Sequence, residues 1–382
     1  MKIRIGYGLG TRSSTNDMER FSALVDTLET LRFDSLWLSE KVTDTCPDPV
    51  VGMAFAAGRT TRLKFGTSVL VLPGRNPMLV AKELATLDRL SGGRLLPAFG
   101  IGQVDPREQQ AFGVDRRERG RRFDEMLPLV RRFWAEDSVD HDGAFFTFTD
   151  ARVLPKPVQD PIEVWFGGIS EHALRRTGQL GDGWLPSFCT PDDVGSGRRE
   201  IERIAAEAGR TIDPEHFGVL VPYAPDGTPD AVLDTVLAAI ACRRPDVDPR
   251  DVMAGDLADL RALLERFVEV GASKFVVVPL DEPTDWADHL HAHITPAIDA
   301  PALLFFVKDQ EFGTVQPHAA VFRGPGRRDP AFGVQLEVPM FNLGECWTVR
   351  QMAQLIGIFL LEEPAHFFAE AHIAHSIPVG HC

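Results

Sequence analysis

The stretch that decides the fold is Arg62–Gly102, RLKFGTSVLVLPGRNPMLVAKELATLDRLSGGRLLPAFGIG, which predicts a strand, a helix and a second strand. Leu63–Leu70 is rich in β-branched and apolar residues with few charges, the composition of a strand buried on both faces of a parallel sheet. Apolar side chains then recur at helical spacing over Met78–Leu90, and Pro77 suits the first helical position. Arg94–Ile101 follows as a second buried strand. The stretch therefore predicts one complete βαβ unit.

The same alternation of strands and helices continues over roughly 300 residues, which predicts an α/β fold of the (β/α)8, or TIM-barrel, type. A doubly wound open sheet is the alternative, but the Gly-rich phosphate loop that usually follows its first strand is missing. The other strands are expected at Lys2–Leu9, Phe33–Leu38, Ile162–Phe166, Asp182–Leu185, Phe217–Tyr223 and Lys274–Pro279, and the main helices at Asp17–Leu31, Asp48–Gly58, Asp115–Trp134, Ser170–Gln179, Asp192–Ala208, Pro229–Cys242 and Asp256–Val270.

Two segments depart from this alternation. His141–Pro161 contains three prolines and is interpreted as an insertion that covers the mouth of the barrel. After a barrel domain at residues 1–300, residues 301–382 form a C-terminal extension to which the sequence assigns no fold. The extension could be a disordered, accessory or oligomerisation segment, or a non-native extension of the reading frame. Its His and Glu spacings supply too few ligands for a zinc or di-iron site, so no metal site is predicted.

Composition limits the partners of the chain. The 382 residues are 44% hydrophobic and 25% charged, as in an ordinary globular protein. The net charge of −15 argues against a nucleic-acid or anionic-membrane partner, because either would need a basic face. The five cysteines form no C-x-x-C pair, the first residues show no signal-peptide core, and no apolar run could span a bilayer. A cytoplasmic protein that acts on a small molecule is expected.

Candidate functional residues follow the predicted strands, because a barrel of this type builds its site at the carboxyl ends of the strands. Most residues there are small or apolar, which suits a large, flat cofactor better than a metal centre or a hydrolytic triad. Gly167, Gly168, Ile169 and Ser170 lead into a helix whose free N–H groups favour an anion such as a cofactor phosphate. An ordinary turn capped by Ser170 is the alternative.

Few titratable residues lie at these strand ends. Glu40 and Lys41 follow the second strand, where a general acid or base would be useful, and a solvated ion pair is the alternative. Gln103 follows the fourth strand; it cannot transfer a proton and could only hydrogen-bond a ligand. We therefore predict Glu40 and Lys41 as catalytic candidates and Gln103 as a binding candidate.

Five segments in combination resemble the bacterial luciferase-like family of flavin- and deazaflavin-dependent oxidoreductases, and the resemblance covers about residues 1–300. It is closest to the branch that uses coenzyme F-420. The segments are FDSLWLSEK (33–41), TTRLKFGTSVLVLPGRNP (60–77), AKELATLDRLSGGRLLPAFGIG (81–102), FGVDRRERGRRFDE (112–125) and GISEHALRRTGQLGDGW (168–184).

The resemblance implies a (β/α)8 barrel with an insertion over the cofactor, commonly as a homodimer. It also implies a ring-binding site at the strand ends, where a non-prolyl cis peptide after the third strand backs the cofactor ring. The matching position here is Ser68–Val69. Gly167 and Gly168 match the phosphate-binding glycines of the family, with Ile169 and Ser170 beside them.

The function implied is hydride transfer between coenzyme F-420 and a small organic substrate. Two alternatives stay open: an FMN-dependent monooxygenase that uses O2, and a cofactor-binding barrel without catalytic activity. The sugar-phosphate dehydrogenases of the family carry an Asp-His pair where this chain has Glu40-Lys41, and an acidic residue where it has Gln103. Their acid–base mechanism is therefore not expected here, and neither is a sugar-phosphate substrate.

Overall fold

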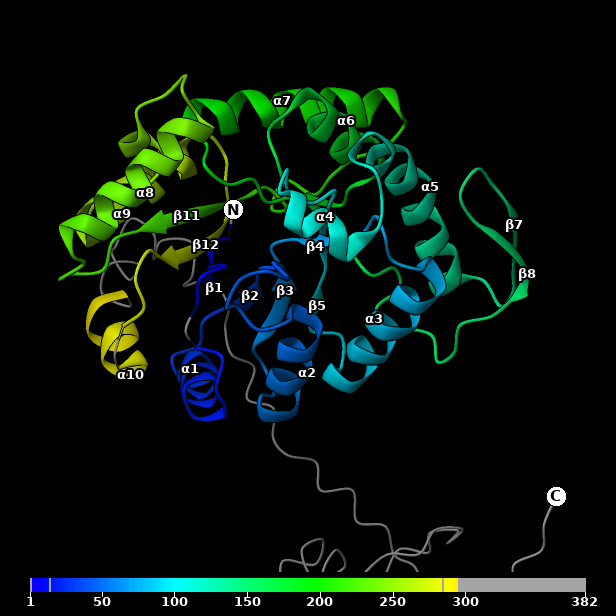
Figure 1. Ribbon diagram of the computed structural model, residues 1–382, viewed down its shortest axis with the longest axis horizontal. Helices are drawn as coiled ribbons and strands as arrows, with labels where there is room; N and C mark the ends of the chain where they lie inside the picture. The colour runs from blue at the N-terminus through cyan, green and yellow to red at the C-terminus, as the bar shows by residue number, and fades with distance from the viewer. Residues whose placement is uncertain (1, 14, 284, 295–382) are drawn as a thin grey trace, which may run out of the picture. The chain divides into compact units, whose positions relative to one another are not determined.

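A closed ring of parallel strands forms the centre of the protein, whose computed structural model describes residues 2–13, 15–283 and 285–294 (Figure 1). One sheet has the order β11-β12-β1-β2-β3-β5 and another the order β10-β9-β6-β4, and a parallel bridge between Trp184 and Phe217 joins β10 to β11. The ring strands are β1 (Arg4–Leu9), β2 (Ser35–Leu38), β3 (Lys64–Thr67), β4 (Leu70–Val71), β5 (Leu95–Leu96), β6 (Ala98–Gly100), β9 (Trp165–Phe166), β10 (Gly183–Trp184), β11 (Gly218–Tyr223) and β12 (Lys274–Pro279).

The ring confirms the predicted (β/α)8 barrel, with one refinement at its third and fourth positions. Each of these was predicted as one continuous strand, and each consists of two short strands that pair with different neighbours. The third position is interrupted at Ser68–Val69, and the fourth at Pro97, which has no N–H to donate to a ladder. Both interruptions lie where the two sheets of the ring meet.

Helices surround the ring on its outside (Figure 1). The opening stretch shows why they form where they do: the Asn76 side chain accepts the N–H groups of Met78 and Leu79, and Gly92 ends the helix in the left-handed region at φ 68°. The helices are α1 (Met18–Thr30), α2 (Pro49–Arg59), α3 (Pro77–Ser91), α4 (Pro106–Phe112), α5 (Arg116–Ala135), α6 (Glu171–Leu180), α7 (Pro191–Glu207), α8 (Asp230–Arg243), α9 (Leu257–Glu269) and α10 (Trp286–Asp288).

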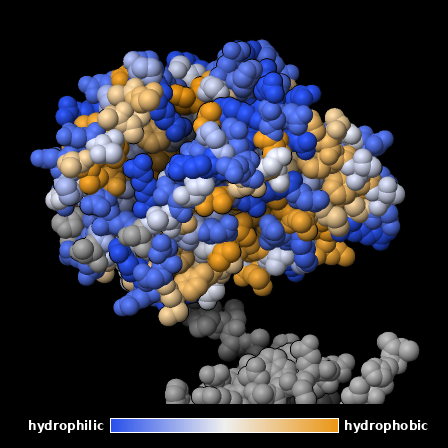
Figure 2. Space-filling model, in the orientation of Figure 1, coloured by the Kyte–Doolittle hydropathy of each residue, from blue (hydrophilic) through white to orange (hydrophobic). Residues whose placement is uncertain are grey.

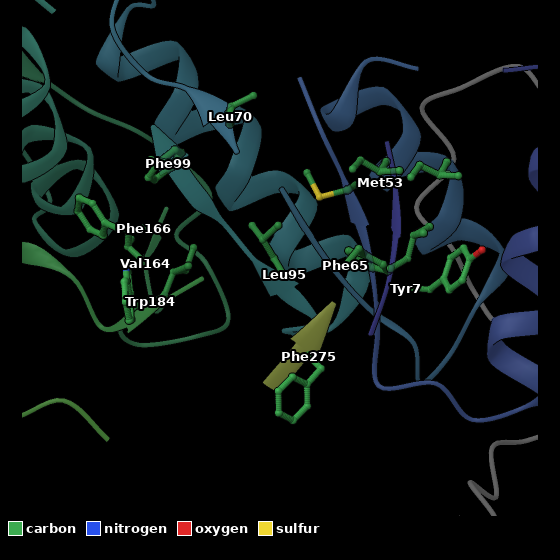
Figure 3. Close-up of a cluster of buried hydrophobic side chains, with 14 of the residues drawn as sticks. Tyr7, Met53, Phe65, Leu70, Leu95, Phe99, Val164, Phe166, Trp184 and Phe275 are labelled. Atoms are coloured by element: carbon green, nitrogen blue, oxygen red, sulfur yellow. The ribbon is translucent and has the colours of Figure 1, made fainter. Parts of the chain in front are cut away.

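Alternate residues of the strands divide the core into two layers. Outward-facing side chains pack against the helices, and Figure 3 shows part of this outer layer, including Phe65, Phe99 and Phe275. Inward-facing side chains fill the ring itself, as expected for a barrel of eight strands. The inner layer consists of Trp37, Leu96, Ala98, Trp165, Leu185 and Val276, with the half-buried Val69, Leu220 and Val278 packed against it.

A buried ion pair lies at the amino ends of the strands. Nζ of Lys274, the first residue of β12, is 2.8 Å from a carboxylate oxygen of Asp34, and the Lys274 side chain is only 4% exposed. The same ammonium lies 5.9 Å and 5.7 Å from the ring centroids of Trp37 and Trp165. Burial acts to raise the pKa of Asp34, but the neighbouring ammonium outweighs it, so that this pKa lies below its usual range. The Lys274–Asp34 pair is therefore buried in its charged form at the amino ends of the strands.

The predicted insertion at 141–161 overlaps a β-hairpin, β7 (Val139–Asp142) with β8 (Thr147–Ala151), that packs on the outside of the barrel. Phe148 of β8 contacts Phe133 of α5 edge to face, with ring centroids 5.1 Å apart. After the hairpin, Gln159 donates through Nε2 to the carbonyl of Leu95, which begins β5. These contacts place the segment beside the outer helices and at the amino ends of the strands.

The expectation that this insertion covers the barrel mouth is therefore wrong. Its prolines indicated an excursion from the βα pattern, but the direction of the excursion depends on contacts with α5 and with the distant α3, where the Asp88 carboxylate accepts the N–H groups of Val158 and Gln159. Helix α4 lies at the mouth instead, because the Glu108 carboxylate accepts the N–H groups of Val42 and Thr43. These contacts join the loop after β6 to the loop after β2, and both loops leave the carboxyl ends of their strands.

Exposed apolar side chains occur on the outer helices. Figure 2 shows orange, apolar atoms over the part of this face where Figure 1 places α3 and the β7–β8 hairpin. Four side chains of α3 and the segment after β8 are more than half exposed: Leu79, Leu90, Leu154 and Val158. Among the described residues, no helix is long and apolar enough to cross a membrane. The predicted extension at 301–382 lies outside the described residues.

Candidate functional site

The floor of the barrel mouth is apolar and closely packed around Val69. This side chain lies half-buried on the inner layer of the core, together with Leu220 and Val278. Two glycines leave it this position: a Cβ at Gly100 of β6 would lie 2.5 Å from Cγ2 of Val69, and one at Gly167, just after β9, would lie 3.2 Å from its Cγ1. The strand ends thus form a low apolar surface of the kind that a flat ring system can cover.

The peptide bond that presents Val69 is cis, as the resemblance implied for Ser68–Val69. The last backbone bond from β2 to this segment runs from the Ser68 N–H to the Leu38 carbonyl, at 2.8 Å. Beyond it, the hydroxyl of Ser39 donates to the Ser68 carbonyl at 3.2 Å and lies 3.1 Å from the Ser68 hydroxyl. The segment after β3 is therefore joined to the end of β2 by side chains.

Glu40 is held inside the protein beside this segment. Its side chain is 4% exposed, one oxygen accepts the Val71 N–H at 2.6 Å, and the other accepts from the Arg75 guanidinium. Burial raises the pKa of Glu40 above its usual range, although Arg75 and the Val71 N–H oppose this shift. Glu40 is thus buried and bound to Val71 and Arg75. It does not form the solvated ion pair with Lys41 that the sequence left open as an alternative.

Lys41, the second catalytic candidate, turns to a different partner. Its ammonium lies 3.1 Å from a carboxylate oxygen of Asp44 in the loop after β2, and both side chains are less than one-fifth exposed. Glu108 of α4 binds this loop, because its carboxylate accepts the Thr43 N–H at 2.9 Å. The two adjacent candidates therefore do not form one acid–base pair: Glu40 is directed at the segment after β3 and Lys41 at its own loop.

The predicted anion site lies at the start of α6. Ser170 caps this helix, since its hydroxyl accepts the Ala173 N–H at 3.3 Å, and the preceding Gly168 takes φ 88°, which favours glycine. The Gly168 carbonyl accepts from Nε1 of Trp184 at 2.9 Å, which fixes the turn to β10. Gly168 and Ser170 are exposed and Ile169 is half-buried, so the N-terminal end of α6 is open to a ligand.

Arg119 of α5 is the site residue that the sequence did not single out. It has no solvent exposure, and its Nη2 atom is buried without a hydrogen-bond partner among the residues that the structure describes. Nη1 donates to the Ile101 carbonyl at 3.2 Å, which brings the guanidinium to the loop that follows β6. One helical turn further on, Phe123 packs against Phe166, the residue before Gly167, with ring centroids 5.5 Å apart. The unpaired donor therefore lies near the ends of β6 and β9.

An unpaired, buried guanidinium is costly unless something accepts its hydrogen bond. Burial lowers the pKa of Arg119, yet a guanidinium stays protonated in proteins. A ligand phosphate is the acceptor that a guanidinium fork matches best. The structure thus fits a phosphorylated cofactor in two independent ways, through the free end of α6 and through Nη2 of Arg119. Gln103, in contrast, is exposed on the loop after β6.

Comparison with known proteins identifies the family of the chain. The model of a family described as luciferase-like monooxygenases matches residues 2–271. Limonene 1,2-monooxygenase of Rhodococcus erythropolis is 32% identical over 198 residues, which cover 50% of this chain and 51% of that protein. An F-420-dependent glucose-6-phosphate dehydrogenase of Kineococcus radiotolerans is 32% identical over 162 residues, 40% of this chain and 47% of that protein. This chain thus spans about half the length of these two relatives.

Solved structures show the same architecture. An F-420-dependent secondary alcohol dehydrogenase, in complex with an F-420–acetone adduct, superposes with a TM-score of 0.66. The match covers 78% of this chain and all of that one, at 22% sequence identity. At this identity the likeness concerns the fold, and it agrees with the ring of strands described above.

Proposed function

The chain belongs to the luciferase-like monooxygenase family, and on this premise we propose that it is an oxidoreductase that transfers hydride between coenzyme F-420 and a small organic substrate. The observation that carries the proposal is the mouth of the barrel, where an apolar floor at Val69 and a buried, unpaired donor on Arg119 lie at neighbouring strand ends. A flat ring with a phosphate side chain matches both features. The similarity to an F-420-dependent dehydrogenase supports the choice of cofactor.

Each part of the site would have a separate task. Val69, presented by the cis peptide, would support one face of the ring, and Gly100 and Gly167 leave the space that a close approach requires. The N-terminal end of α6 at Gly167, Gly168, Ile169 and Ser170, with Nη2 of Arg119, would hold the phosphate. When bound, the deazaflavin supplies the hydride chemistry. The protein's contribution is orientation and exclusion of water.

Lys41 is the residue that we propose as the proton partner of the reaction. Its ammonium is close to the mouth, on the loop that α4 covers, and it lies 3.1 Å from a carboxylate oxygen of Asp44. Gln103, exposed on the loop after β6, would contact the bound molecule through hydrogen bonds only. A cytoplasmic location and a homodimer stay predictions.

An FMN-dependent monooxygenase is the second candidate function, because the chain is also similar to limonene 1,2-monooxygenase. The two candidates use the same apolar floor and phosphate site. They differ in the reaction of the reduced cofactor with O2, which is fast for a flavin and slow for a deazaflavin. A barrel that binds cofactor without catalysis is the third candidate.

Titration of the cofactor-free protein separates these candidates. We expect coenzyme F-420 to bind, which is followed by the decrease of its fluorescence on binding to the protein. Its Kd should be lower than the Kd of FMN measured in the same buffer. Tight FMN binding without measurable F-420 binding would support the monooxygenase instead, and O2 consumption by the reduced complex would then be measured. Binding of neither cofactor would contradict the proposal altogether. Cofactor binding with no turnover on a broad panel of organic substrates would favour the non-catalytic barrel.

A further inference from the structure

A closed set of hydrogen bonds surrounds the backbone of Val71, two residues after the cis peptide. Glu40 accepts the Val71 N–H at 2.6 Å, and Nε of Arg75 donates to the Val71 carbonyl at 3.0 Å. The Arg75 guanidinium also donates to the other oxygen of Glu40. One carboxylate and one guanidinium therefore bind both backbone groups of a single residue and also bind each other. We call Glu40, Arg75 and the Val71 backbone the Glu40 clamp.

The clamp lies where the backbone ladder of the barrel is interrupted. Leu38 is the last residue of β2 to pair with β3, opposite Thr67. The strand that continues after the cis peptide, β4, pairs on its other side with β6, Leu70 opposite Phe99. On the side of β2, no strand of the described part of the chain pairs with the Val71 N–H, and Glu40 is its acceptor. The carboxylate thus replaces a ladder partner, and an unsatisfied N–H at this buried position would be costly.

We propose that Glu40 is a positioning residue that, together with Arg75, holds residues 68–71 so that Val69 lies in register at the floor of the mouth. The proposal rests on the proposed function, in which Val69 supports the cofactor ring. Glu40 acts through Val71 and Arg75 and does not exchange protons with the substrate, because both of its oxygens are occupied and its side chain is 4% exposed. This positioning role replaces the catalytic role that the sequence indicated for Glu40.

The clamp gives cofactor binding a characteristic dependence on pH. Glu40 must be ionised to accept from both Val71 and Arg75, and burial raises its pKa above the usual range. The charged groups that face it are Arg75, which favours ionisation, and Asp48 at the start of α2, which opposes it. As pH falls through this raised pKa, Glu40 becomes protonated and the clamp loses its charge pair. Cofactor affinity is therefore expected to decrease at a pH above that at which an exposed Glu titrates.

The test compares Glu40→Gln, Arg75→Met and the double variant with the matched control Glu83→Gln, an exposed carboxylate on α3. We expect each clamp variant to raise the Kd of coenzyme F-420 about tenfold, the size of a lost hydrogen bond to a charged group. The Kd of the double variant should be no higher than the Kd of either single variant, because each substitution breaks the same set of hydrogen bonds. Glu83→Gln should bind as the wild type does. In Glu40→Gln, the Kd of coenzyme F-420 should also lack the increase that we expect for the wild type as the pH falls.

Hydrogen exchange of the cofactor-free protein provides a second readout that does not depend on the cofactor. Peptides that contain the Val71 amide should exchange faster in Glu40→Gln than in Glu83→Gln. If the wild type binds neither F-420 nor FMN but this difference persists, the proposed function fails and the clamp stands. If Glu40→Gln keeps wild-type Kd and wild-type exchange but loses turnover, Glu40 is the proton-transfer group and the clamp proposal is overturned. Additive losses in the double variant would also overturn it.

Discussion

Replacing Arg119 with methionine is expected to raise the Kd of coenzyme F-420 and FMN about 30-fold, the loss of roughly 2 kcal/mol that a charge-assisted hydrogen bond contributes. Methionine keeps most of the buried volume of the side chain and removes the guanidinium, together with its bond to the Ile101 carbonyl. Nη2 of Arg119 is buried without a partner among the described residues, so a bound phosphate would be its acceptor. The loss should therefore depend on the phosphate of the ligand.

Riboflavin, which has the ring of FMN without its phosphate, provides the comparison. Fluorescence titration should show the same riboflavin Kd for Arg119→Met and the wild type, so that only the phosphorylated ligand distinguishes them. Arg116→Met is the matched control, since Arg116 is an exposed arginine on the same helix and its removal changes the net charge equally. Equal losses for FMN and riboflavin would mean that Arg119 supports the fold of the site and does not bind phosphate.

Replacing Lys274 with alanine is expected to lower the free energy of unfolding by about 3 kcal/mol, the cost of leaving a buried charge without its partner. The ammonium is 2.8 Å from Asp34, and it contacts the aromatic faces of Trp37 and Trp165 at the floor of the barrel. Without it, Asp34 must take up a proton or draw water into the inner layer. Because the pKa of Asp34 is lowered by Lys274, the stabilisation is present above the usual pKa of an aspartate and is lost as pH falls through the lowered value.

Urea unfolding followed by circular dichroism measures this effect. Lys64→Ala is the control, because Lys64 begins β3 at the same edge of the barrel and is half-buried, and its expected loss is below about 1 kcal/mol. The double variant Asp34→Leu with Lys274→Met should recover much of the lost stability, since it removes both charges and keeps the volume. Equal losses for Lys274→Ala and Lys64→Ala would show that the pair contributes no more than a surface charge.

The barrel could be predicted because its signals are local. Apolar runs, helical spacing and breaks such as Pro77 recur along the chain, and each one is decided by residues close in sequence. The family resemblance added the position of the cis peptide at Ser68–Val69. The course of the segment at 141–161 could not be predicted in this way, because it depends on Phe148 meeting Phe133 and on Gln159 reaching Leu95. Such contacts leave no periodic pattern in the sequence.

The candidate site was predicted in outline, and its charged groups were not. Arg119 lies in the run RRERGRR, which is typical of a solvated helix face, and burial of one arginine among six charged residues is not evident from composition. A usable signal existed: Arg119 precedes Phe123, Met126 and Val130 at helical spacing, so it falls on the buried face of α5. For Glu40 no such signal exists, because its partner Arg75 follows only after α2, β3 and β4.

The most direct test of the central claim, that a flat phosphorylated cofactor covers Val69 at the mouth of the barrel, is a crystal structure of the full chain with coenzyme F-420. We predict that the deazaflavin ring lies against the Ser68–Val69 peptide and that a phosphate oxygen accepts from Nη2 of Arg119, beside the N-terminal end of α6. A ring bound away from Val69, or a phosphate with no contact to Arg119 or to Gly167–Ser170, would contradict the claim.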